Sequence, residues 1–287
     1  MDSRKLNCTL LSFPMNCPPS EPNCELSEFV EIRFVGLRRS GTHAVQNWLI
    51  SLFEGPVCYL NDVTEKRKIL PDQPSDDLPA IRGVGKAARL NEPKCLLLYA
   101  MEDRRLQFLR SFRFENPGGG AEPSRKIDVL LLRDPYNTIA SRLKIGRDRP
   151  GNGFFRDMFM RRPDGTAFFP QLWKNYAKEF LGEMNCLNAD KLCVNFNRWE
   201  GEKSYRDEIS HRLYAGRKSN EAAAREVPGW GFGSSFDATE FNGKADEMDL
   251  DNRWRVFADD PEFRELADDA EMRELSERIF GISGPEW

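Results

Sequence analysis

The chain has 287 residues, of which 40% are hydrophobic, and its 42 lysines and arginines against 46 aspartates and glutamates give a net charge of −4. This length and apolar content suffice for one substantial core, whereas the acidic balance argues against a nucleic-acid partner, which would need a basic surface. No stretch is apolar for long enough to span a bilayer, so we expect a protein with no membrane partner and a cytoplasmic location.

The chain begins with a segment unlike the rest. Residues 1–27 predict an irregular leader, because proline and polar residues dominate there, and we expect residues 28–287 to form a single domain. Phe29–Gly36 then predicts a buried strand, and Thr42–Phe53 predicts a helix with one apolar face.

Apolar runs and amphipathic segments alternate along the rest of the chain. Because the strands are apolar along their whole length and alternate with helices, we expect a mostly parallel sheet covered on both faces, in a three-layer α/β/α fold. Sheets of this kind bind ligands at the carboxyl ends of their strands. Further strands are predicted at 56–60, 94–101, 127–133 and 191–197, helices at 103–112, from 134 onward, at 169–184 and 204–216 and within the last forty residues, and surface loops at 62–93 and 113–126.

The cysteines and histidines limit the metal and redox chemistry. The seven cysteines are odd in number and scattered, so we expect free thiols rather than a disulfide framework. With only two histidines, His43 and His211, a multi-histidine metal centre is excluded, and no metal is expected.

The segment "GLRRSGTH" separates the first strand from the first helix. Gly36 and Gly41 have the spacing of a P-loop, whose successive N–H groups surround a phosphate. The lysine and the magnesium-binding hydroxyl of a nucleotide triphosphatase are replaced by Thr42 and His43, and the cation stands earlier, at Arg39. This pattern indicates a nucleotide-linked group that is transferred without metal; the alternative is a solvated turn.

A second polar pattern follows the strand at 127–133. Arg133 leaves the strand end, and Ser141 lies about two turns into the next helix, which Asp134 and Pro135 begin. A guanidinium and a hydroxyl in this arrangement can bind a phosphate. Taken alone, the pattern equally fits an ordinary helix start with a surface ion pair.

Together the two patterns resemble sulfotransferases that use 3′-phosphoadenosine-5′-phosphosulfate (PAPS). Their phosphosulfate loop commonly has Lys/Arg-Ser-Gly-Thr, matched by Arg39-Ser40-Gly41-Thr42, and their second motif has Arg-Asp/Asn-Pro with a serine eight residues after the arginine, matched by Arg133 to Ser141. The resemblance implies a P-loop-like sulfotransferase fold, PAPS as co-substrate and adenosine 3′,5′-bisphosphate (PAP) as product. It places the 5′-phosphosulfate at residues 38–43, which include Arg38 and His43, and the 3′-phosphate at Arg133 and Ser141.

The resemblance also bears on catalysis. Arg39 would neutralise the bridging oxygen, and Glu102 would be the base, because many family members place a base just after the strand that precedes the 3′-phosphate strand. His43 and Asp103 are the other candidate bases, while Glu102 could instead be an exposed acid at a helix start that Asp103 caps. The family usually closes the site with a loop late in the chain, and we expect Gly233, Ser234 and Ser235 to form it. The alternative is that these residues form an ordinary loop.

The sequence thus predicts a PAPS-dependent sulfotransferase that transfers a sulfuryl group to a hydroxyl or amine of a small-molecule acceptor, in a role such as secondary metabolism. Two alternatives stay open: a P-loop kinase with altered loop chemistry, and a nucleotide-binding protein without catalysis. The sequence leaves the identity of the acceptor and the oligomeric state open.

Overall fold

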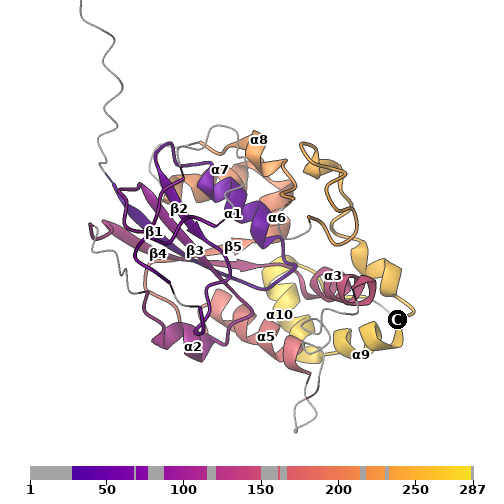
Figure 1. Cartoon of the computed structure of the whole chain (residues 1–287). Coiled ribbons are helices and arrows are strands. Elements are labelled where there is room, and N and C mark those ends of the chain that lie inside the picture. Colours follow the sequence, from indigo (N-terminus) through magenta and orange to yellow (C-terminus); the bar gives the residue numbers. More distant parts are fainter. Residues whose placement is uncertain are drawn as a thin grey trace, which may run out of the picture.

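The computed structural model describes residues 28–67, 69–76, 87–114, 121–149, 161, 167–213, 218–229 and 233–285. In this part of the chain, five strands form one sheet in the order β2-β3-β1-β4-β5, and every neighbouring pair is parallel (Figure 1). The predicted α/β fold with a parallel central sheet is confirmed, while the leader at 1–27 lies outside the described residues. The strands are β1 (Val30–Gly36), β2 (Val57–Leu60), β3 (Leu96–Glu102), β4 (Arg125–Leu132) and β5 (Lys191–Asn195).

Helices cover both faces of the sheet because alternate strand residues point to opposite faces. In β1, Ile32 and Phe34 pack with one set of helices, whereas Val35 packs with the other. The first set is α1 (Thr42–Ile50), α6 (Phe196–Gly201), α7 (Lys203–Leu213) and α8 (Glu221–Ala224). The second set is α2 (Leu106–Ser111), α3 (Pro135–Asp148), α5 (Phe168–Phe180), α9 (Pro261–Ala267) and α10 (Ala270–Phe280) (Figure 1). Two short 3-10 helices, η2 (Ala245–Glu247) and η3 (Arg253–Phe257), lie between α8 and α9.

Three predicted segments differ from the structure. Helix α2 begins at Leu106 rather than at 103, because the chain first turns through Asp103 in the left-handed region, with φ of 56°. Strand β5 ends at Asn195, whose side chain accepts a hydrogen bond from the N–H of Arg198 and so begins α6. In the excursion at 62–93, the described part is not confined to the surface, since Leu90 is fully buried in the core.

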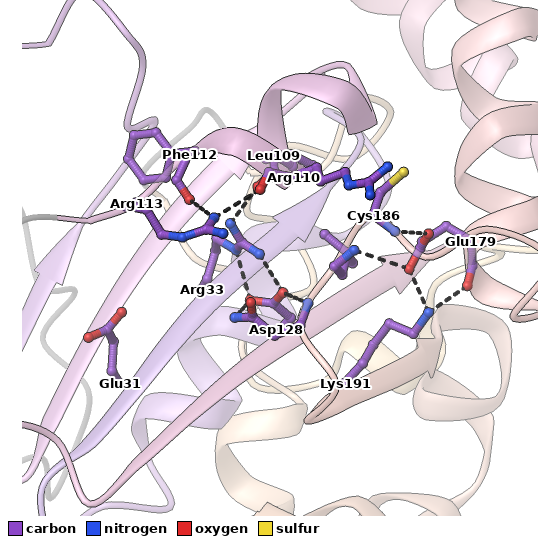
Figure 2. A network of polar contacts seen from close by, with 12 residues as sticks. Glu31, Arg33, Leu109, Arg110, Phe112, Arg113, Asp128, Glu179, Cys186 and Lys191 are labelled. Carbon is purple, nitrogen blue, oxygen red and sulfur yellow. Dashed lines mark hydrogen bonds and ion pairs between the residues drawn. The ribbon is translucent and has the colours of Figure 1, made fainter.

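A buried ionic network lies on the face of the sheet that α2 and α5 cover (Figure 2). Arg33 of β1 donates two hydrogen bonds to Asp128 of β4, at 2.7 and 2.5 Å, and a third to the carbonyl of Leu109 at 2.8 Å. The backbone N–H and the side-chain amide of Asn188 donate hydrogen bonds to the two oxygens of the Asp128 carboxylate. Because both charges are paired and hydrogen-bonded, the network tolerates burial, and it fastens α2 and the 188 region to the sheet.

The described residues contain four of the seven cysteines. The described cysteines, Cys58, Cys95, Cys186 and Cys193, are free, as predicted, while the other three lie outside the described residues. Within the described ranges, no helix is both long and apolar enough to cross a bilayer, and no group of three or more metal-type ligands gathers.

Candidate functional site

A cavity of about 680 Å³ opens at the carboxyl edge of the sheet. Each strand contributes to its lining from the residues at or just beyond its end: Asp62 after β2, Glu102 of β3, Gly41 after β1, Arg133 after β4 and Phe196 after β5. This volume is in the range of small-molecule sites, and the position is the one expected for a parallel sheet. Every site residue predicted from the sequence lines this cavity except Ser40 of the loop, which is fully buried.

The loop between β1 and α1 has the backbone of an anion cradle. Arg39 and Gly41 both have positive φ, of 70° and 82°. A Cβ on Gly41 would lie 2.0 Å from the ring of Phe196, so only glycine fits between the loop and this ring. No side chain caps the first N–H groups of α1. These groups and the positive end of the helix dipole therefore face the cavity together with the loop.

The side chain of Arg39 connects this loop to the late turn at 233–238. Its Nε donates to Ser235 Oγ at 2.7 Å, and its Nη2 donates to the carbonyl of Gly233 at 3.0 Å. The turn itself is compact, because the backbones of Ser234 and Ala238 bond to each other in both directions and a Cβ on Gly233 would meet the Ala238 carbonyl at 2.3 Å. The late residues predicted at the site thus contact the loop, 194 to 196 positions away in sequence.

Several guanidinium groups converge on one end of the cavity. Burial first, and then repulsion from Arg142, Arg133 and Arg149, lower the pKa of Arg39 to about 10, against the attraction of Glu102. Burial, with repulsion from Arg133 and Arg39, likewise lowers the pKa of Arg253 to about 10, although Asp237 raises it. Positive charges that lower one another's pKa in a cavity would be stabilised by a bound polyanion.

Arg133 and Ser141 each have a buried donor that makes no hydrogen bond among the described residues, although Arg133 Nε also lies 3.8 Å from Asp134 Oδ2. Arg133 is 2% exposed; its Nη2 donates to the carbonyl of Leu250 at 2.5 Å and its guanidinium lies over the Phe196 ring, but its Nε is buried without a hydrogen bond. Ser141 is 1% exposed, and its Oγ also lacks a partner. Asp134 caps α3 through the N–H of Asn137 at 2.8 Å, as predicted, and so fixes the helix that carries Ser141. Buried donors without a partner are a cost that a bound phosphate would remove.

Glu102 is the last residue of β3; it lines the cavity and is only 6% exposed. The interpretation of Glu102 as an exposed acid at a helix start is therefore wrong. Its Oε1 accepts a hydrogen bond from Thr42 Oγ1 at 2.5 Å, and its Oε2 lies 3.5 Å from Arg38 Nε. Burial raises the pKa of this carboxyl above its usual value, against the hydrogen bond from Thr42 and the charge of Arg38, which lower it.

Asp103 does not cap α2, because that helix starts three residues later. Its Oδ1 accepts from the backbone N–H of Arg38 at 3.2 Å and from Arg142 Nη2 at 2.5 Å. Arg142 belongs to α3 and is fully buried, so Asp103 ties the loop to the helix that carries Ser141.

The side chain of Arg38 lines the cavity and contacts three carboxylates. Its Nη2 contacts Asp62 Oδ2 at 2.5 Å, and burial, which acts to lower its pKa, is outweighed by Asp62, Glu102 and Asp103, which raise it. Arg38 therefore neutralises carboxylates at the rim of the cavity. His43, half-buried at the start of α1, lines the cavity beside the loop.

Among the lining residues that sequence reasoning missed, three stand next to the loop or the arginine cluster. Phe196 and Trp199 follow β5, and the rule that ligands bind beyond the strand ends could have identified them. Arg253 carries no such signal, since it enters the cavity from η3, which no periodicity predicts.

Comparisons with known proteins add little to this geometry. No protein-family model matches the chain, and a search of curated proteins finds no match. Among solved structures, the chain is similar to the crystal structure of mouse sulfotransferase SULT7A1 complexed with PAP, with 12% sequence identity and a TM-score of 0.40 over 86% of this chain and 88% of that chain. A TM-score of this size is too low to assign an activity.

Proposed function

We propose that the protein is a PAPS-dependent sulfotransferase, which moves a sulfuryl group to a hydroxyl or amine and releases PAP. The observation that carries the proposal is the meeting, in one cavity, of a glycine-bearing loop with the guanidinium groups of Arg39, Arg133 and Arg253 and the unpartnered hydroxyl of Ser141. A nucleotide that carries a second phosphate besides its 5′ group supplies the negative charge that this cluster of guanidinium groups needs, and the loop and Ser141 offer a separate donor set to each phosphate.

The residues present fit such a nucleotide. Arg133 Nε and Ser141 Oγ, both buried and without a hydrogen bond among the described residues, would hold the 3′-phosphate. The loop N–H groups and Arg39 would hold the 5′-phosphosulfate, where no side chain competes at the start of α1. Phe196, over Gly41, would form an apolar wall for the nucleoside between the two phosphates.

The chain's own residues then have clear tasks. PAPS supplies a sulfur whose bond to a phosphate oxygen breaks as a bond to the acceptor oxygen or nitrogen forms. Arg39 stabilises the negative charge that stays on the phosphate oxygen, and Glu102 takes the proton that the acceptor loses. Both groups belong to the same lining, and Glu102 is near enough to raise the pKa of Arg39 by its charge.

A second candidate function is nucleotide binding without turnover. It is favoured by the contacts of Glu102, whose two carboxylate oxygens already face Thr42 and Arg38. A kinase with altered loop chemistry gains no comparable support, because Thr42 and His43 stand where its lysine and magnesium hydroxyl would be. The single domain at 28–287, the small-molecule acceptor, the cytoplasmic location and the role in secondary metabolism stay predictions.

Calorimetry with PAP, ADP and ATP, each with magnesium and with a chelator, tests the nucleotide assignment. We expect PAP to bind most tightly of the three nucleotides, because it is the one with a 3′-phosphate for Arg133 and Ser141. Its affinity should be the same with magnesium and with the chelator. Tighter binding of ATP with magnesium would contradict the proposal and favour the kinase. Mass spectrometry of acceptors incubated with PAPS then separates catalysis, seen as a gain of SO₃, from binding alone.

A further inference from the structure

The order of the strands divides the cavity into two halves. The loop after β1 is central, with β4 and β5 on one side and β3 and β2 on the other. Arg133 and the aromatic lining residues Phe196 and Trp199 belong to the β4–β5 half. If the nucleotide lies there, as the proposed function requires, the sulfuryl end meets the β3–β2 half, which must receive the acceptor.

The β3–β2 half is polar and nearly balanced in charge. Asp62 accepts from Arg38 Nη2 at 2.5 Å and from Arg104 Nη2 at 2.9 Å. Glu102 contacts Thr42 at 2.5 Å and lies 3.5 Å from Arg38. The carboxylates of Asp62 and Glu102 are thus each in contact with a guanidinium group, so neither is left as an unpaired charge that would select an ammonium ion.

Asn61 adds a hydrogen-bonding group that the protein does not use. Its backbone is fixed, since its N–H donates to Asp76 Oδ2 at 2.6 Å and its carbonyl accepts from Arg67. Its side chain lines the cavity, and its Oδ1 is buried with no hydrogen-bond partner among the described residues. A buried amide oxygen in this state costs free energy unless a donor from a ligand or a water reaches it.

We propose that this half binds a hydroxyl-rich acceptor, a sugar or another polyol, through Asn61, Asp62 and Arg38, with one hydroxyl at Glu102. A hydroxyl both donates and accepts, so a row of hydroxyls satisfies a wall that mixes amide, carboxylate and guanidinium groups without adding charge. The apolar surface of a phenol or a steroid would leave the Asn61 Oδ1 unpaired, and the described aromatic lining residues, Phe196 and Trp199, lie in the other half. The inference rests on the proposed function, since the nucleotide decides which half is free.

The test uses the full chain saturated with PAP, so that it does not depend on turnover. Saturation-transfer NMR would compare D-glucose and myo-inositol with 4-nitrophenol and ethanolamine as probes. We expect transfer to the two polyols and little to the other two. Transfer to the phenol or the amine in place of the polyols, or to none of the four, would overturn the proposal.

A pair of variants locates the polyol. Asn61→Leu removes the unpartnered amide but keeps the backbone contacts of residue 61, and it should weaken polyol binding about tenfold while PAP affinity stays unchanged. The control is Asn175→Leu, on α5 and away from the cavity, which should change neither. Equal polyol binding by Asn61→Leu and the wild type would refute the assignment. Failure of PAP to bind at all would instead refute the proposed function, so the two failures are distinguishable.

Discussion

Ser141→Ala gives an unusual combination of effects if Ser141 holds a phosphate. The side chain is 1% exposed and its Oγ has no partner among the described residues, so the substitution removes no hydrogen bond of the folded protein. The free energy of unfolding should stay unchanged or rise, because a buried hydroxyl without a partner costs about 1–3 kcal/mol. A hydrogen bond to a charged phosphate contributes about 1.5–3 kcal/mol, so PAP should bind about 10- to 150-fold more weakly.

Calorimetry with PAP and urea denaturation together measure both effects. The matched control is Ser276→Ala, since Ser276 of α10 is also fully buried with an unpartnered Oγ but does not line the cavity. The control should share the effect on stability and leave PAP affinity unchanged. If Ser141→Ala binds PAP within about twofold of the wild type, the 3′-phosphate does not lie at this hydroxyl and the reasoning from unpartnered donors fails.

Three further substitutions test other parts of the site. Glu102→Gln should lower turnover by about 10²–10⁴-fold while the affinity for PAP stays unchanged. Burial raises the pKa of Glu102 above its usual 4.5, and the base acts in its deprotonated form, so the turnover of the wild type should rise with pH above that value. A pH profile that Glu102→Gln leaves unchanged would count against this base. Gly41→Ala should abolish nucleotide binding in a thermal-shift assay because its Cβ would meet Phe196, whereas Gly182→Ala, with a similar φ of 79° and open space around it, should cost only about 1–2 kcal/mol of stability and bind normally. Asp103→Asn keeps a residue that tolerates positive φ but leaves the buried charge of Arg142 unpaired. Urea denaturation should show that the free energy of unfolding falls by about 3–5 kcal/mol. A fall of less than about 1 kcal/mol would mean that this ion pair does not tie the loop to α3.

The sequence predicted the strands and the edge where the cavity lies, because apolar strands that alternate with helices leave few alternatives to a parallel sheet. It could not predict the pair of Arg33 and Asp128, since the two residues are 95 positions apart and only the register of β1 against β4 brings them together. Arg253 was hidden for a similar reason: it stands far along the chain in a short 3-10 helix, and only tertiary packing brings it to Arg133.

The most direct test of the account is a crystal structure of the chain with PAP bound. We predict the 3′-phosphate within hydrogen-bond distance of Arg133 Nε and Ser141 Oγ, and the 5′-phosphate against the loop N–H groups of residues 39–42. A complex with its phosphates elsewhere, or with the 3′-phosphate in solvent, would contradict the assignment of this cavity to a 3′-phosphorylated nucleotide.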